Sequence, residues 1–312
     1  MISIAQSQSR SKSQLHYDSS KLGQSLLHVL FLLLSAACIL PLVLVVAVSF
    51  SDETTVIANG FKFWPEKFSL RAYDLVFLDY MQIIRSYGVS LFVTVVGTII
   101  SLILVSLFAY PLSRSDLKYR GFFAFLIFFT MLFNGGLVPW YLVYVNYLHL
   151  MDSIWALILP LLLTPFYVII MRTFFSTTIP SELLESAKID GSGEWYTFMR
   201  IVLPLSLPVL ATIGLFNTLN YWNDWFLSLL YIDESKNVSV QYLMYRTLNS
   251  IQYILSNSAV ANGISQGGGS LDLPSKTLQM AMAVVGIGPI IFAYPFFQKF
   301  FVKGLTLGAV KG

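Results

Sequence analysis

The sequence of 312 residues contains little charge: Asp, Glu, Lys and Arg make up only 11% of it, whereas 56% is hydrophobic. An average soluble domain carries about 25% charged residues, so this composition excludes an ordinary soluble domain and indicates an integral membrane protein. The net charge of +3 is also small. Because a nucleic-acid-binding surface needs concentrated positive charge, no nucleic acid is expected as a partner.

Reactive side chains are equally scarce. The one cysteine, Cys38, lies inside an apolar run, and the three histidines are scattered along the chain. The sequence lacks the HExxH and CxxC spacings of metal sites and the GxxxxGK[S/T] loop that binds phosphates. We therefore expect no catalytic residue, no metal and no cofactor in this chain.

Long hydrophobic runs are abundant. About 20 apolar residues in a helix cross the hydrocarbon core of a bilayer, and six runs reach that length: 26–50, 86–113, 121–145, 153–176, 203–230 and 278–301. These runs predict an all-α integral membrane fold with six transmembrane helices, which form one membrane domain over residues 26–301. Gly135, Gly136 and Pro139 interrupt the third run and predict a kink or a close contact between helices there.

The positions of Lys and Arg predict the orientation of the chain. Cytoplasmic segments are enriched in these residues, and the short segment between the second and third runs holds Arg114, Lys118 and Arg120. With this segment inside, both termini are cytoplasmic.

The same topology assigns the remaining segments. Residues 1–25 and 302–312 become cytoplasmic tails, and residues 51–85 and 231–277 become extracytoplasmic loops. In the second loop, apolar residues from Val240 to Leu255 recur at helical spacing, which predicts an amphipathic helix.

Ionisable side chains inside the predicted spans are few, and Arg172 and Asp224 are the main ones. A proton-driven transporter usually places several such groups in its spans as a relay. The shortage disfavours a stand-alone secondary transporter. If the chain moves a solute uphill, the energy is expected to come from another protein.

One polar segment, residues 181–203, stands between two hydrophobic runs on the predicted cytoplasmic side. Asp190-Gly191 predicts a sharp turn that ends a first helix and is braced by the Asp190 side chain. Ser192 is predicted to cap a second helix, whose apolar face comprises Trp195, Phe198, Met199 and Val202. Such a helix pair is either a connector at the membrane surface or a docking element for a soluble partner.

The order and spacing of these residues resemble the EAA motif of ABC importer permeases. The matching residues are Glu185-Ser186-Ala187, Asp190-Gly191 and Ile201-Val202-Leu203-Pro204, with Ser186 where the family has Ala. The resemblance implies that residues 181–203 are coupling helices that seat in a cleft of an ATPase subunit. The docking residues it implies are Glu185, Ser186, Ala187, Asp190, Gly191, Trp195, Phe198, Leu203 and Pro204.

Much of the remaining chain resembles the carbohydrate-uptake branch of these permeases, of the maltose-permease G-subunit type, and within it the LplC/YtcP-like oligosaccharide group. Three stretches carry this resemblance: "NGGLVPWYLVYVNYLHLMDSIWALILP", "NYWNDWFLSLLYI" and "YPFFQKFFVKGLTLGAVKG". It implies a type I importer permease in the bacterial cytoplasmic (inner) membrane. The implied partners are a second permease, two ABC ATPase subunits that bind ATP and magnesium, an extracytoplasmic solute-binding protein, membrane lipid and an oligosaccharide.

A polar stripe is predicted in the fifth span. Asn217, Asn220, Tyr221 and Asp224 follow helical spacing i, i+3, i+4 and i+7, and Trp222 and Trp225 add flat apolar faces. Amides and a carboxylate facing lipid are costly, so the stripe is expected to face protein or solute. It lines a solute pathway or holds helices together against the partner permease.

These observations favour the permease subunit of an ATP-driven oligosaccharide importer. A permease for a peptide or polyol remains an alternative, as does a stand-alone secondary transporter. The resemblance further implies that the C-terminal tail reaches into the ATPase dimer, whereas its basic residues are equally consistent with a cytoplasmic anchor.

Overall fold

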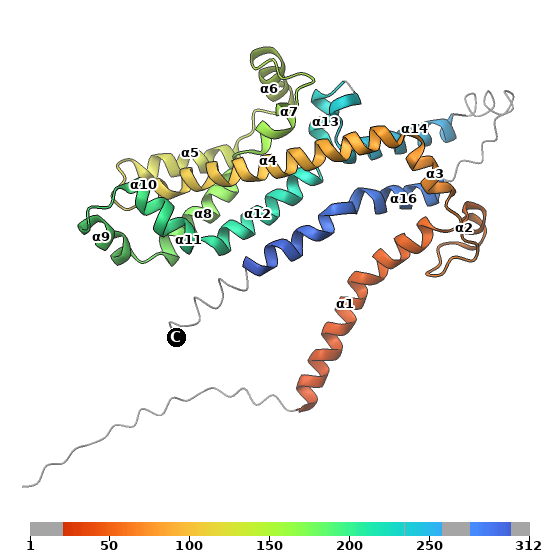
Figure 1. Ribbon diagram of the computed structural model, residues 1–312, viewed down its shortest axis with the longest axis horizontal. Helices are drawn as coiled ribbons and strands as arrows, with labels where there is room; N and C mark the ends of the chain where they lie inside the picture. Colours follow the sequence, from red (N-terminus) through yellow and green to blue (C-terminus); the bar gives the residue numbers. More distant parts are fainter. Residues whose placement is uncertain (1–20, 234, 258–274, 301–312) are drawn as a thin grey trace, which may run out of the picture.

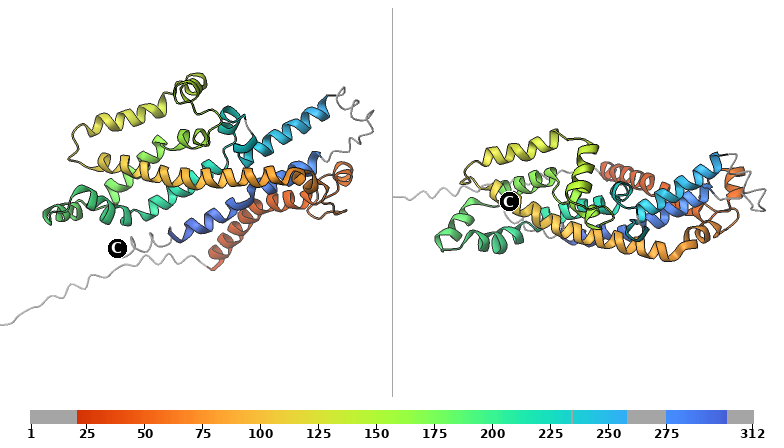
Figure 2. Two further views of the ribbon diagram at one scale, coloured as in Figure 1. Left: turned by 45° about the horizontal axis from the view of Figure 1, so that its top comes forward. Right: turned by 90° about the horizontal axis from the view of Figure 1, so that it is seen from above.

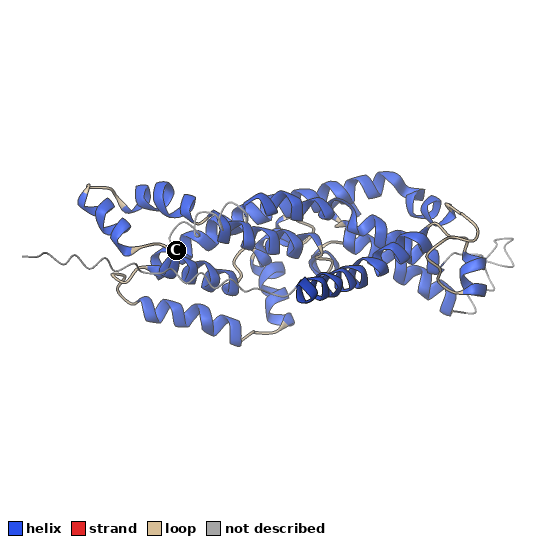
Figure 3. Ribbon diagram, turned by 90° about the horizontal axis from the view of Figure 1, so that it is seen from below, coloured by secondary structure: helices blue, strands red, loops and turns tan. Residues whose placement is uncertain are grey.

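The computed structural model describes residues 21–233, 235–257 and 275–300, and the two predicted tails lie largely or wholly outside these ranges. All regular secondary structure in the described residues is helical (Figures 1 and 3). The only β pairing in these residues is an isolated bridge between Ser51 and Phe68. The prediction of an all-α fold is therefore confirmed for this part of the chain.

Three continuous helical segments of the described chain are long and apolar enough to cross a membrane. The first is α1 (Lys21–Ser49). The second joins α3 (Arg71–Val76), a 3₁₀ turn (Phe77–Asp79) and α4 (Tyr80–Ser113), and the third begins with α16 (Ser275–Ile287) and ends at Phe300. Helix α1 begins at Lys21, within the predicted tail 1–25, and α4 begins at Tyr80, within the predicted loop 51–85.

The other three predicted spans are bent pairs of helices. Helix α5 (Arg120–Leu132) is followed by α6 (Leu137–Leu142) and a π-turn (Val143–Tyr147) at 111°, so the predicted span 121–145 is not straight. The break falls at Gly136, whose φ is +88°, which confirms the kink predicted there. Counting each bent pair as one span gives up to six spans in the described residues.

Prolines explain the other two bends. Helix α7 (Trp155–Ile158) and a 3₁₀ turn (Leu159–Leu161) meet α8 (Pro165–Thr178) at 48°. Proline lacks the N–H that would continue the preceding helix, and Pro165 opens α8. In the same way Pro208 lies in the first turn of α12 (Leu207–Trp222), which makes an angle of 76° with the helix before it.

Helix α4 is the central element and packs along α8 and α12 (Figure 1). The contact with α12 is close: a Cβ on Gly97 would lie 2.5 Å from Cζ of Tyr221. Only glycine fits here, so the absence of a side chain at position 97 permits the close approach of α4 and α12.

The predicted inner and outer segments lie at opposite ends of the molecule. Helices α9 (Ser181–Ile189) and α10 (Glu194–Thr197) lie at the left end in Figure 1, whereas α2 (Glu53–Asn59), α3 and α14 lie at the right end. Helix α14 (Val240–Ser256) confirms the predicted amphipathic helix, and its residues Val240 and Met244 are buried. This separation agrees with the predicted topology.

Glu53 joins two segments that are far apart in the sequence. Its side chain is only 8% exposed. Oε2 accepts hydrogen bonds from the backbone N and the hydroxyl of Thr277, both at 2.8 Å, and Oε1 accepts one from the backbone N of Lys276 at 2.9 Å. Free N–H groups and the helix dipole favour an anion at this position, so Glu53 of α2 caps the N-terminus of α16.

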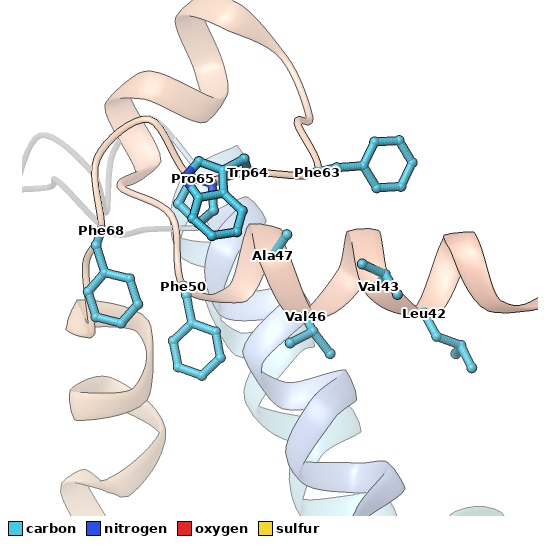
Figure 4. A pocket seen from close by; sticks show the side chains of 9 residues that line it. All are labelled: Leu42, Val43, Val46, Ala47, Phe50, Phe63, Trp64, Pro65 and Phe68. Carbon is cyan, nitrogen blue, oxygen red and sulfur yellow. The ribbon is translucent and has the colours of Figure 1, made fainter.

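The aromatic segment after α2 folds back over the outer end of α1 (Figure 4). Together they form an open groove of about 620 Å³ lined only by apolar residues: Leu42, Val43, Val46, Ala47, Phe50, Phe63, Trp64, Pro65 and Phe68. The groove offers no polar side chain to a hydrophilic solute, so it is not a candidate for solute recognition.

Candidate functional site

The polar segment 181–203 forms a helix pair whose turn depends on Gly191. This residue has φ +78°. The N–H of Ser192 donates a hydrogen bond to the carbonyl of Ala187 at 2.9 Å. The N–H of Gly191 donates one to the carbonyl of Lys188 at 3.1 Å. This is the Schellman pattern that ends helices at a left-handed glycine, so the predicted turn is confirmed. The predicted brace by the Asp190 side chain is absent from the hydrogen bonds of the described residues.

The second helix of the pair begins one residue later than predicted and extends further. Gly193, rather than Ser192, is the N-cap of α10, and no side chain caps this helix. Helix α10 continues through a π-turn (Phe198–Val202) and α11 (Leu203–Leu205). Leu203-Pro204 therefore lies in the last turn of this helix, and α12 starts at Leu207 after the bend.

The predicted docking residues divide between the surface and the interior. Phe198 and Ala187 are buried and Leu203 is half-buried, so they support the pair from inside. Six of the predicted residues are exposed: Glu185, Ser186, Asp190, Gly191, Trp195 and Pro204. Phe198 and Val202 of the predicted apolar face are buried, whereas Trp195 and Met199 are exposed. The rings of Trp195 and Phe198 lie 5.9 Å apart, so the bundle covers one part of this face and leaves the other part exposed.

Two further large apolar side chains are exposed on the helix pair: Tyr196, which follows Trp195, and Ile189, the last residue of α9 before the turn. Ile189 is 85% exposed, Trp195 is 62% exposed, and Tyr196 is exposed as well. Large apolar side chains at the tip of a polar segment are typical of a surface that binds another protein. The sequence analysis missed Ile189 and Tyr196 because a helical wheel alone does not show which side the bundle covers.

The second helix of the pair is attached to the end of α4. The Tyr110 hydroxyl donates a 2.7 Å hydrogen bond to Oε2 of Glu194, and the Tyr110 ring lies 5.0 Å from that of Phe198. Arg114 Nη2 lies 3.5 Å from Oε1 of Glu194 and pairs with Asp116 at 3.0 Å. The hydrogen bond from Arg114 lowers the pKa of Asp116, which keeps this pair charged. These contacts attach the start of α10 to the end of α4.

The predicted polar stripe is not continuous. Helix α12 ends at Trp222, and Asp224 lies in the break before α13 (Phe226–Tyr231). There Oδ1 of Asp224 accepts a 3.0 Å hydrogen bond from the N–H of Leu227, as a capping residue does. The prediction that Asp224 continues the helical face of Asn217 is wrong, because this carboxylate starts a new helix.

Three stripe residues lie inside the chain. The Tyr221 hydroxyl donates to the carbonyl of Ile158 at 2.9 Å, and Trp222 Nε1 donates to that of Gly286 at 3.1 Å. Asn217 is 0% exposed, which excludes contact with a partner permease in this conformation. Asn220 and Trp225 are exposed and Asp224 is half-buried, so these three remain accessible to a solute or a partner.

The structure combines helices of membrane-spanning length with a polar helix pair exposed at one end. Residues 120–307 match the family described as binding-protein-dependent transport system inner membrane component. The chain belongs to this family of ABC transporter permeases, in which the EAA motif and coupling helix are typical. It is therefore a transport subunit and not an enzyme.

Individual relatives cover nearly the whole chain. It is 43% identical over 293 residues to the Bacillus subtilis polygalacturonan/rhamnogalacturonan transport system permease protein YtcP, covering 94% of this chain and 99% of the relative. It is 42% identical to the protein LplC of the same organism, with coverage of 89% and 90%. It is 28% identical to the Halalkalibacterium halodurans arabinooligosaccharides transport system permease protein AraQ, with coverage of 92% and 96%.

A solved structure has the same fold. It is a crystal structure of a bacterial ABC transporter involved in the import of the acidic polysaccharide alginate. The match has a TM-score of 0.72 and 27% identity, and it covers 91% of this chain and 99% of the other. In general, a permease of this family works with a second permease, an ATPase and a solute-binding protein.

Proposed function

We propose that this chain is the permease subunit of an ATP-driven importer in the bacterial cytoplasmic membrane that translocates an oligosaccharide. An extracytoplasmic solute-binding protein delivers the solute, and two ATPase subunits bind ATP and magnesium. The support comes from relatives named for saccharide transport that align over nearly the full chain. The observation that carries the proposal is the exposed helix pair held on α4 by Tyr110 and Glu194.

The proposed topology treats each bent pair of helices as one span, with both termini in the cytoplasm. The helix pair α9–α10 then faces the cytoplasm, and α2, α3 and α14 face outward, which accords with their separation at opposite ends of the bundle (Figure 2). Short or Gly/Pro-interrupted spans are common where a transporter forms its solute pathway. The bends at Gly136 and before Leu207 are features of this kind.

The proposed mechanism is alternating access. The exposed tip formed by Ile189, Trp195 and Tyr196, with Glu185 beside it on α9, seats in the ATPase partner. When ATP closes the ATPase dimer, α10 moves and carries the cytoplasmic end of α4 with it through Tyr110 and Glu194. Because α4 reaches the opposite end of the molecule, the motion alters the outer half of the pathway (Figure 1).

Three accessible residues of the fifth span are assigned to this pathway: Asn220, Asp224 and Trp225. An amide and a carboxylate bond sugar hydroxyls, and an indole offers a flat apolar face. Tyr221, Trp222 and Asn217 are not assigned direct contact in this conformation, since all three are buried.

Purification and reconstitution test the proposal. A tagged chain is expressed with its genomic neighbours, extracted in mild detergent and reconstituted with the purified solute-binding protein. We expect a second permease and an ATPase to co-purify. Saccharide uptake is expected to require ATP on the side of the membrane to which the ATPase is bound. Uptake by the isolated chain without an ATPase would favour the stand-alone transporter instead, and ATP-dependent uptake of peptides or polyols alone would replace the substrate class.

A further inference from the structure

The last helical segment changes its geometry at mid-length. Helix α16 ends at Ile287, and a 3₁₀ turn (Gly288–Phe292) follows, with φ +31° at Gly288. Pro289 lacks an N–H, so the carbonyl of Val285 has no helical donor four residues later. Backbone groups at membrane depth must be satisfied by other parts of the protein, which makes this break costly unless side chains supply the donors.

Three side chains from three helices supply those donors. The Tyr87 hydroxyl of α4 donates to the Val285 carbonyl. Trp222 Nε1 of α12 and Gln241 Nε2 of α14 both donate to the Gly286 carbonyl, at 3.1 and 2.9 Å. The break is therefore built into the fold, and it lies where α14, α16 and the end of α12 meet.

A pocket of about 450 Å³ opens at this meeting point. It is lined by three side-chain amides, an aromatic pair and an apolar wall from α14, α16 and the 3₁₀ turn: Asn223, Gln241, Gln279, Trp225, Tyr245, Met244, Leu248, Met282, Ala283, Gly286, Ile287 and Ile290. The described residues of this lining include no Asp, Glu, Lys or Arg. This combination differs from the wholly apolar groove beside α1 (Figure 4).

The amides keep hydrogen-bonding capacity. The side chain of Gln279 makes no hydrogen bond to the described residues and is exposed. Asn223 donates its N–H to the Leu219 carbonyl and Gln241 donates to Gly286, so each retains its amide oxygen as an acceptor. An amide offers donors and acceptors on one plane, which suits the adjacent hydroxyl groups of a sugar.

The aromatic pair adds a flat apolar surface. The rings of Trp225 and Tyr245 are stacked with centroids 4.2 Å apart, and both side chains are partly exposed. Stacking holds each ring rigid, so its outer face is available to a ligand with little loss of side-chain entropy. Amides beside a rigid aromatic face match the two surfaces of a sugar ring, its hydroxyl edge and its C–H face.

We propose that this pocket is a saccharide-contacting subsite of the import pathway and that it takes a neutral sugar unit. The inference rests on the proposed function and adds its contact residues and charge class. A uronate carboxylate entering the pocket finds no cation in the lining to replace its hydration, and burying an unpaired charge is unfavourable. The relatives do not decide this, since their names include both polygalacturonan and arabinooligosaccharides.

Cysteine protection tests the subsite directly. In the assembled complex carrying Cys38→Ser, Gln279→Cys is treated with a membrane-impermeant maleimide, and labelling at position 279 is read by mass spectrometry. The probes are arabinotriose and trigalacturonate, each with the solute-binding protein. We expect arabinotriose to slow labelling at 279 several-fold and trigalacturonate to have no effect. Asn249→Cys, an exposed amide position of α14 outside this pocket, is the matched control and is expected to stay unprotected.

Transport kinetics provide the second readout. Gln279→Leu and Tyr245→Leu are each expected to lower kcat/KM for arabinotriose about five- to tenfold, the loss of one or two net contacts. Asn249→Leu and Tyr253→Leu change residues of α14 that lie outside the pocket. Both are expected to leave kcat/KM for arabinotriose unchanged.

The outcomes separate the two proposals. If the unsubstituted complex imports a saccharide but position 279 is unprotected and the pocket variants match their controls, the subsite is refuted while the proposed function stands. Protection by trigalacturonate alone overturns the neutral class. If the unsubstituted complex imports no saccharide, the proposed function and the subsite fall together.

Discussion

The Tyr110 hydroxyl at the end of α4 donates a 2.7 Å hydrogen bond to Glu194 at the start of α10. These residues are 84 positions apart, and Phe198 packs against the Tyr110 ring one turn further along the same helix. One polar and one apolar contact therefore fix the second helix of the pair to the longest helix of the bundle. In the proposed mechanism, these two contacts make the end of α4 move together with α10.

Replacing Tyr110 by Phe tests this attachment. The substitution keeps the ring contact with Phe198 and removes only the hydrogen bond to Glu194. Because Glu194 is largely exposed, water replaces part of the loss, and we expect a cost of about 1 kcal/mol. The complex is expected to assemble, with several-fold less uptake per ATP hydrolysed, measured in proteoliposomes.

The matched control is Tyr147→Phe, which removes an exposed phenolic hydroxyl that makes no hydrogen bond to the described residues and lies outside the helix pair. It is expected to keep the wild-type ratio of uptake to hydrolysis. An unchanged ratio in Tyr110→Phe would show that the hydrogen bond has no part in coupling.

Substitutions at Gly191 test the turn of the helix pair. Its φ of +78° disfavours any residue with a Cβ by about 1 kcal/mol or more, although nothing lies within 4 Å of the position of that Cβ. We expect Gly191→Val to lower ATPase association and solute-stimulated hydrolysis, and Gly191→Asp to do the same. Glu185→Ala is expected to act in the same direction but mildly, since an exposed ion pair contributes only about 0–1 kcal/mol.

Gly191→Asn separates strain from docking, because Asn tolerates positive φ. If strain alone matters, Asn restores most of the stimulated hydrolysis per assembled complex. If the ATPase approaches the glycine closely, Asn impairs it as Asp does. Full stimulation in Gly191→Asp would instead support a simple connector role for the segment.

The order and type of the elements could be predicted from the sequence, because hydrophobic length and Gly/Pro signals act locally. Residues 240–255 form an amphipathic helix, and Gly136 and Gly191 occupy bends, as their patterns predict. The helix breaks near Pro165 and Leu207 were missed, since apolar composition continues through them. Hydropathy measures whether a segment is apolar, not whether its hydrogen bonds are continuous.

The candidate site was predicted less completely. The turn at Asp190-Gly191 has a strong local signal, whereas burial of Tyr221 and Trp222 depends on Ile158 and Gly286, which are distant in the sequence. Asp224 was assigned to the wrong face because an Asp can either continue a polar stripe or cap a helix. The pocket beside Gln279 had no sequence signal, since it needs three helices to meet.

The contact between Glu53 and α16 predicts an effect on stability. Glu53→Ala leaves the backbone N–H groups of Lys276 and Thr277 without their acceptor, and an unsatisfied buried donor costs about 1–3 kcal/mol. We expect a lower melting temperature of the purified complex. Glu53→Gln keeps one acceptor oxygen and is expected to lose less. Glu66→Ala, in the same loop but at an exposed ion pair, is the control and should leave the melting temperature unchanged.

The topology predicts opposite labelling of two exposed positions. Asn249→Cys represents the outer end and Lys118→Cys the inner end, because both positions are exposed; each is made in a Cys38→Ser background. An impermeant thiol reagent added to intact spheroplasts is expected to label Asn249→Cys only, and Lys118→Cys is expected to react after lysis. Labelling of both positions from outside would refute the orientation.

The two asparagines of the fifth span are predicted to differ. Asn220 is exposed, so Asn220→Leu is expected to lower uptake several-fold while the complex assembles at its normal melting temperature. Asn217 is fully buried, and neither its amide nitrogen nor its amide oxygen has a hydrogen-bond partner among the described residues. A buried amide without partners costs roughly 1–3 kcal/mol. Asn217 therefore lowers the stability of this conformation.

This cost gives Asn217→Leu an unusual predicted signature. Leu has nearly the same volume, so the substitution removes the unsatisfied amide without leaving a cavity, and the melting temperature is expected to rise or stay unchanged. If Asn217 makes hydrogen bonds in the alternate state of the transport cycle, the substitution removes those bonds and destabilises that state. Uptake is then expected to fall although assembly is normal. Melting temperature and uptake are measured on the same reconstituted complex. A lower melting temperature with normal uptake per assembled complex would show instead that Asn217 holds helices together in the resting state, and that α12 contributes to the pathway only through Asn220.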